Sequence, residues 1–247
     1  MAGIKLFDPF SRRADISRAD FSHHWITHHA EIVTHIRRIT RYVQSVRLDD
    51  SPALLDELFS SSSWDGCAET WHPTSSSVLA MPHEPRFAEL MADERNFLDL
   101  TRPRHLISSE ETLVDEHGFD PRVRGVKLLV FVRRRPEVSG SDFADRWPSA
   151  ADRDLGRRLA VTRHVRCTAI GHIARAADGS GDLGAAGAAS VSDDEYDGVQ
   201  ELWWRHLRAM EDALAAQPEA AQRLLASDLI DAPRSTTLIA HERIIVA

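Results

Sequence analysis

This chain is organised around residues 17–39, which read Ser-Arg-Ala-Asp-Phe-Ser-His-His-Trp-Ile-Thr-His-His-Ala-Glu-Ile-Val-Thr-His-Ile-Arg-Arg-Ile. We predict one amphipathic helix here, because at about 100° per residue its large apolar side chains fall on a single stripe. Ser17 is placed to cap the start of the helix, with Asp20 three positions further on. The apolar stripe consists of Phe21, Trp25, Ile32, Ile36 and Ile39.

Several histidines lie on this helix, and two of them, His28 and His29, stand at opposite edges of its apolar stripe. An imidazole that is half-desolvated at such an edge is suited to proton transfer near neutral pH. The alternative interpretation is that these rings belong to the core margin and bond to backbone or water. A metal ion held by His24, His28 and His35 is a further, less favoured alternative, because no acidic or cysteine partner is placed to complete the set.

The sequence contains an internal repeat. Displaced by 122 residues, segment 138–170 aligns with segment 16–48 without a gap, so that one Phe-x-x-x-Trp step falls on another. Displaced by 132 residues, Tyr196-Asp-Gly aligns with Trp64-Asp-Gly. Each copy has the pattern strand, helix, strand, strand, helix, strand, which is typical of a ferredoxin-like unit. The sequence therefore predicts a tandem duplication.

The repeat predicts two domains of similar length, residues 1–114 and residues 126–247. A polar linker over 115–125, which contains a glycine and a proline, is expected to join them. Residues 176–193 are rich in small side chains and are expected to form a flexible loop between two strands. The predicted fold class is α+β, with two tandem ferredoxin-like (βαββαβ) domains.

Composition excludes several classes of function. The formal net charge of −8 and the lack of a basic block argue against a nucleic-acid partner. No apolar run is long enough for a membrane span and the first residues lack a signal-peptide core, so a cytoplasmic protein is expected. Cys67 and Cys167 lie in apolar, strand-like segments, which favours buried thiols over a disulfide.

The sequence resembles the EthD family in three features. They are the pattern Phe21-x-x-x-Trp25-x-x-x-His29, a strand that begins at Arg41, and the motif Trp64-Asp-Gly. The resemblance extends over nearly the whole chain. It implies that two ferredoxin-like units pair through their sheets into a dimeric α/β barrel, here within one chain, usually without a tightly bound organic cofactor. It also implies degradation of ethers and aromatic compounds or polyketide tailoring.

The histidine of the family pattern falls on His29, and the second copy has Ala151 at that position. We therefore predict one working site, in the first half, with the second half kept mainly as the barrel partner. The predicted activity is that of a cofactor-independent lyase or isomerase, by proton abstraction, elimination or decarboxylation on a small apolar ring or polyketide-type compound. His29 is the expected general base, with Tyr42 or Arg41 stabilising the oxyanion. The predicted substrate-binding residues are Phe21, Trp25, His28 and Gln44.

Other functions remain open at this stage. Several dimeric α/β barrels bind haem through a histidine, so His28, His29 or His35 is a candidate iron ligand. A non-catalytic protein that binds a small molecule or assists an oxygenase is another alternative. Asp65 and Glu69 recur in the second copy as Asp197 and Glu201, which favours a structural role for them. The expected partners are a small-molecule substrate and, through outward tryptophan-rich surfaces, further copies of the barrel.

Overall fold

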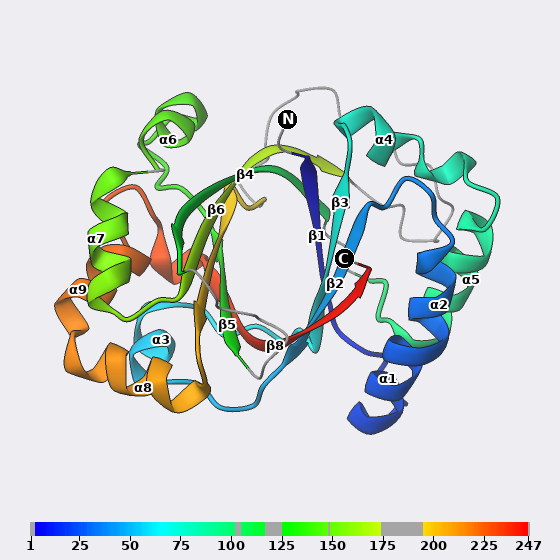
Figure 1. Ribbon diagram of the computed structural model, residues 1–247, viewed down its shortest axis with the longest axis horizontal. Helices are drawn as coiled ribbons and strands as arrows, with labels where there is room; N and C mark the ends of the chain where they lie inside the picture. Colours follow the sequence, from blue (N-terminus) through cyan, green and yellow to red (C-terminus); the bar gives the residue numbers. More distant parts are fainter. Residues whose placement is uncertain (1–2, 102–104, 117–124, 148, 174–194, 247) are drawn as a thin grey trace.

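Eight antiparallel strands close into a barrel, and helices pack on two opposite sides of it (Figure 1). The computed structural model describes residues 3–101, 105–116, 125–147, 149–173 and 195–246. Most of the predicted linker and the whole predicted loop over 176–193 lie outside these described residues.

The order of strands around the barrel is β1-β3-β2-β8-β5-β7-β6-β4. Strands β1 to β4 are therefore neighbours, strands β5 to β8 are neighbours, and two seams, β2–β8 and β4–β6, join the two halves. The predicted α+β class and the barrel closed within one chain are confirmed. The strands are β1 Ile4–Phe10, β2 Arg41–Arg47, β3 Gly66–His72, β4 His105–Asp115, β5 Val126–Val132, β6 Arg163–Ile173, β7 Gly198–Trp204 and β8 Thr236–Val246.

The helices form two layers outside the sheet (Figure 1). α1 Arg18–His24, α2 Ala30–Thr34, α4 Ser75–Leu79 and α5 Phe87–Phe97 cover the first half. α6 Gly140–Arg146, α7 Ala150–Arg158, α8 Leu207–Ala216 and α9 Pro218–Leu225 cover the second. The short helix α3, Ala53–Leu58, comes from the first half but packs into the apolar core of the second. None of the described helices is both long and apolar enough to span a membrane.

The predicted helix over 17–39 consists of three pieces. Ser17 caps α1 by accepting a hydrogen bond from the backbone N–H of Asp20, as predicted. A π-helical turn, Trp25–His29, then separates α1 from α2. The helix ends at Thr34, five residues earlier than predicted, because the next two N–H groups bond three residues back and tighten the last turn.

The two Asp-Gly signals of the repeat each place a glycine under a tryptophan. A Cβ added at Gly66 would lie 2.6 Å from the Trp25 ring, and one added at Gly198 would lie 2.3 Å from the Trp147 ring. Both rings are almost fully buried. The glycines therefore allow the indole of each Phe-x-x-x-Trp step to lie flat on the sheet.

We expect Gly198→Ala to lower the free energy of unfolding by about 3 kcal/mol, because the methyl group overpacks a rigid buried ring. Gly140→Ala is the matched control, since a Cβ there meets nothing within 4 Å and the residue lies in α6. The control is expected to change stability by less than about 1 kcal/mol, in the stabilising direction. Chemical denaturation measures both, and equal losses would contradict this packing account.

A buried layer of charge fills the middle of the barrel. Lys5 Nζ lies 2.7 Å from Glu201 and 2.7 Å from Glu69. Lys127 Nζ lies 2.7 Å from Glu69 and 2.5 Å from Glu201. All four side chains are at most 1% exposed. The structural role expected for Glu69 and Glu201 is thus realised as two ion pairs that cross between the halves. In the same interior, Cys67 and Cys167 are free, buried thiols, as predicted.

The pKa of Glu201 is set by two opposing effects. Burial alone raises it, but the attraction of Lys127 and Lys5 lowers it by more, to about 2. The unfolded carboxyl has a pKa of about 4.3. The ionised carboxylate therefore stabilises the folded protein fully above about pH 4.3, and this contribution is lost as the pH falls toward 2.

We expect Glu201→Gln to lower the free energy of unfolding at pH 7 by about 3 to 5 kcal/mol, because it leaves buried ammonium groups short of a partner. The difference from the wild type should shrink as the pH falls from about 4.3 toward 2, where the wild-type carboxylate also takes up a proton. Asp154→Asn, in an exposed ion pair, is the control and should cost no more than about 1 kcal/mol. Denaturation series across this pH range give both results, and a pH-independent difference would contradict the assignment.

Candidate functional site

Three of the predicted site residues form one buried hydrogen-bonded group between the helical layer and β2. Trp25 Nε1 donates to the Tyr42 hydroxyl at 2.9 Å. Gln44 Nε2 donates to the same hydroxyl at 3.0 Å and to the Trp25 carbonyl at 2.8 Å. Burial raises the pKa of Tyr42, so its hydroxyl stays protonated at neutral pH. The structure thus brings these residues together as a packed support for the π-helical turn.

Phe21 and Arg41 lie apart from each other. Phe21 packs in the same core as Trp25, with its ring 5.8 Å from that of Phe97. Arg41 lies on the opposite face of β2, with its guanidinium 4.4 Å above the Trp71 ring. The structure therefore does not bring Arg41 together with His29.

A second group of predicted residues surrounds a carboxylate that the sequence did not single out. His29 Nδ1 lies 2.9 Å from Asp93 Oδ2, and His24 Nε2 lies 2.8 Å from Asp93 Oδ1. The exposed ring of His28 is 3.5 Å from the same Oδ1 atom. Burial raises the pKa of Asp93, but the hydrogen bonds with His29 and His24 outweigh it, so the net pKa is lowered. Asp93 therefore stays ionised and orients the buried imidazole of His29.

Asp93 could not be found from sequence. It lies on α5, 64 residues after His29, among the 38 acidic residues of the chain. The π-helical turn that holds His29 is a feature found frequently at functional sites. Nevertheless, His29 is not among the lining residues of the cavities of about 440, 580 and 640 Å³.

Among the described residues, His24, His28 and His35 do not come together as the metal site considered above. His35 Nδ1 bonds to the Glu31 carbonyl at 2.8 Å, within its own helix. Among the described residues, one set alone brings three metal-ligating atoms within 4.8 Å of one another, and it contains no histidine. In that set, Glu201 already pairs with the Lys5 ammonium. Haem ligation by His28, His29 or His35 stays a prediction.

We expect Asp93→Ala to lower the free energy of unfolding by about 2 to 3 kcal/mol, since two imidazoles lose a charged hydrogen-bond partner. His28→Ala is the control, because that side chain is 59% exposed and makes only the 3.5 Å approach. The control should cost less than about 0.5 kcal/mol. Denaturation at pH 7 measures both, and an Asp93→Ala protein as stable as the control would contradict the account of this cluster.

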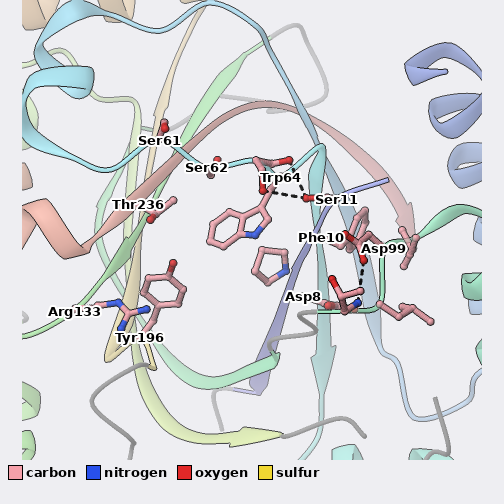
Figure 2. Close-up of a pocket in the computed structure, with 15 residues that line it drawn as sticks. Asp8, Phe10, Ser11, Ser61, Ser62, Trp64, Asp99, Arg133, Tyr196 and Thr236 are labelled. Carbon is pink, nitrogen blue, oxygen red and sulfur yellow. Dashed lines mark hydrogen bonds between the residues drawn. The ribbon is translucent and has the colours of Figure 1, made fainter. Parts of the chain in front are cut away.

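A pocket of about 440 Å³ opens at one end of the barrel (Figure 2). Aromatic rings from both halves line it, namely Phe10, Trp64 and Tyr196. Its charged residues are Asp8, Asp99 and Arg133, and Figure 2 shows the two carboxylates on one side and the guanidinium on the other. Hydroxyl groups complete the lining, from Ser11, Ser61, Ser62, Ser63 and Thr236.

The pocket lies where the repeated elements of the two halves meet. The Trp64 and Tyr196 rings, which the repeat aligns, are 6.0 Å apart, and Phe131 packs against both. The Arg133 guanidinium lies 4.8 Å from the Tyr196 ring centroid. On the other wall, Asp8 Oδ1 is 3.2 Å from His105 Nδ1. A planar, partly polar molecule fits such a lining, in a volume typical of small-molecule sites.

Sequence reasoning missed this pocket. Neither Arg133 nor His105 belongs to a motif that the sequence singles out, yet Arg133 lines the pocket and His105 begins β4 beside Asp8. The alignment of Trp64 with Tyr196 was the one available signal.

Comparisons with known proteins agree with the barrel. Residues 13–101 match the EthD domain. An anthrone oxidase-like protein of known structure is 10% identical over 100% of this chain and 95% of its own, with a TM-score of 0.65. A chlorite dismutase variant from Candidatus Nitrospira defluvii, in complex with cyanide, is 12% identical over 98% of this chain and 91% of its own, with a TM-score of 0.52. Such identities establish the fold alone. No curated protein matches the chain.

Proposed function

We propose that this chain, whose residues 13–101 match the EthD domain, is a cofactor-independent lyase or isomerase whose substrate binds at the barrel mouth. The proposed substrate is a small, largely apolar ring or polyketide-type carbonyl compound, in catabolism or tailoring. One observation carries the proposal: the Asp8 carboxylate, paired with His105, stands across the pocket from the Arg133 guanidinium. A base opposite a cation is the arrangement that enolate chemistry needs.

In the proposed mechanism, the aromatic walls hold a planar ring between Asp8 and Arg133. Asp8 accepts a proton from a carbon made acidic by the ring carbonyl, and the electron pair of that C–H bond moves onto the carbonyl oxygen. Arg133 stabilises the resulting oxyanion. Asp8 then returns the proton to a different carbon in an isomerisation, or a leaving group departs with the electron pair in an elimination. Such proton transfer contributes about 10²- to 10⁴-fold to the rate.

His29 is the second candidate for the base in the same chemistry. Its Nδ1 bond to Asp93 favours the tautomer whose proton is on Nδ1, which leaves Nε2 as the basic atom. Its ring also packs 4.9 Å from that of Phe97, a residue whose neighbour Leu98 lines the mouth pocket. The two candidates are distinguished by substitution, because they lie on different walls of the first half.

We expect the wild-type protein to speed the exchange of deuterium from solvent into the acidic methylene of anthrone, a tricyclic ring ketone, under anaerobic conditions. Asp8→Asn should slow this exchange at least about 100-fold, because the amide cannot accept the proton. Asp99→Asn is the matched control, a carboxylate of the same pocket that is outside the proposed step, and should change the rate less than about threefold. Proton NMR of the methylene signal measures the rate.

The other outcomes are equally specific. Loss of exchange in His29→Ala, with Asp8→Asn still active, would move the base to His29. Anthrone that quenches tryptophan fluorescence without any exchange would favour the non-catalytic binding protein. Exchange no faster than in buffer, with no binding, would contradict a ring-ketone site at the barrel mouth.

We also propose that the two halves descend from one duplicated ferredoxin-like unit. Support comes from the buried charge layer, in which Lys5 and Lys127 occupy positions 122 residues apart and Glu69 and Glu201 positions 132 apart, as in the sequence repeat. The domain limits at 114 and 126, the cytoplasmic location and further self-association of the barrel stay predictions.

A further inference from the structure

The second half contains a cavity of about 580 Å³ where α7 approaches α9. Trp147, Asp152 and Leu155 line one side, and Gln222, Ala226 and Leu229 line the other. In the first half, the aligned positions of these helices hold the His29–Asp93 pair, for which the second half has Ala151 and Leu225. The second half therefore has a small side chain, Ala151, and an apolar one, Leu225, where the first half has a hydrogen-bonded polar pair.

A buried polar group lies directly behind this cavity. Trp147, His164, Arg166 and Gln200 are each at most 1% exposed. Arg166 Nη1 donates to the Trp147 carbonyl at 2.7 Å, and Gln200 Nε2 lies 3.1 Å from His164 Nε2. Five other polar atoms of this group have no hydrogen-bond partner among the described residues. They are Trp147 Nε1, His164 Nδ1, Arg166 Nε, Arg166 Nη2 and Gln200 Oε1.

The first half satisfies the corresponding group almost completely. His164 and Arg166 align with Tyr42 and Gln44, whose hydroxyl and amide bond to each other and to Trp25. An unsatisfied buried donor costs about 1 to 3 kcal/mol, and such groups are rare in folded proteins. The second half thus keeps buried N–H donors that the same fold can do without.

We propose that these donors form a binding site for a small organic carboxylate with an apolar body, which enters through the cavity between α7 and α9. Trp147 Nε1 and the Nε and Nη2 atoms of Arg166 supply N–H groups, and the fork of a guanidinium matches a carboxylate. Leu155, Ala226 and Leu229 offer an apolar wall for the rest of the molecule. Trp147 and Asp152 line the cavity and also contact Arg166. A single side chain therefore separates the Arg166 guanidinium from the cavity.

Arg166 and Asp152 are the charged side chains of this group, and they act on the ligand in opposite ways. Burial lowers the pKa of Arg166 to about 10, so the guanidinium remains a cation at neutral pH. Asp152 Oδ2 lies 3.1 Å from Arg166 Nη2, without the alignment of a hydrogen bond. The Asp152 carboxylate therefore repels the carboxylate of an entering ligand. Burial raises the pKa of Asp152, so this carboxyl is able to share a proton with the ligand, as paired carboxylates do.

Benzoate is the probe for the test, by titration calorimetry at pH 7 with the full chain. The wild type should bind it at millimolar concentrations or below. The double substitution His164→Tyr with Arg166→Gln introduces the tyrosine and glutamine of the first half and removes the guanidinium, so it should bind benzoate at least tenfold more weakly. Ala151→Trp, at an exposed position of the cavity lining, should weaken binding similarly by filling the cavity.

Arg133→Gln removes the cation of the barrel mouth and should leave benzoate binding unchanged, which separates this site from the proposed catalytic pocket. The absence of any benzoate binding by the wild type at millimolar concentrations would overturn the proposal. So would undiminished binding by the double variant. If the double variant does not fold, undiminished binding by Ala151→Trp would overturn it instead. None of these results depends on whether Asp8 is a catalytic base.

Discussion

Two lysine–glutamate pairs in the centre of the barrel constrain the whole molecule. Lys5 of β1 and Lys127 of β5 each lie between Glu69 of β3 and Glu201 of β7, so each ammonium pairs with one carboxylate of its own half and one of the other half. A buried charge without its partner is strongly destabilising. Separation of the halves would remove one of the two carboxylates from each ammonium, so the charge layer favours the closed barrel. The charge layer fills the middle, and the two cavities proposed as sites lie at the barrel mouth and in the helical layer of the second half.

The features that sequence predicted are those with a local or repeated signal. Short patterns predict the Ser17 cap, the succession of strands along each half and the structural role of Asp65 and Asp197. Each of these aspartates accepts a hydrogen bond from the backbone N–H of an arginine at the end of a neighbouring strand. Gly66 could be recognised in an Asp-Gly turn, but not its contact with Trp25. The π-helical turn was missed, because the 3.6-residue pattern of the helix continues through it.

The candidate sites were only partly predictable, because their residues converge from distant strands. Asp8, Arg133 and Tyr196 come from three separate strand ends and carry no common motif. His29 could be placed at the edge of a helix from its spacing, whereas its partner Asp93 is fixed by the packing of α5. Local periodicity reports which face a side chain occupies. It does not report which charge it meets there, and the chemistry depends on that charge.

The helical layers of the two halves differ. A second half that served only to close the barrel would not need this difference. The first half fills its layer with the His29–Asp93 pair and a satisfied Trp25–Tyr42–Gln44 group. The second half lacks both members of the pair, and the polar group behind its cavity is unsatisfied. The first half has a Tyr, a Gln and an Ala at the positions of His164, Arg166 and Gln200, and the same barrel forms around them. The cost of burying Arg166 therefore argues for a binding role in the second half, in addition to its support of the first.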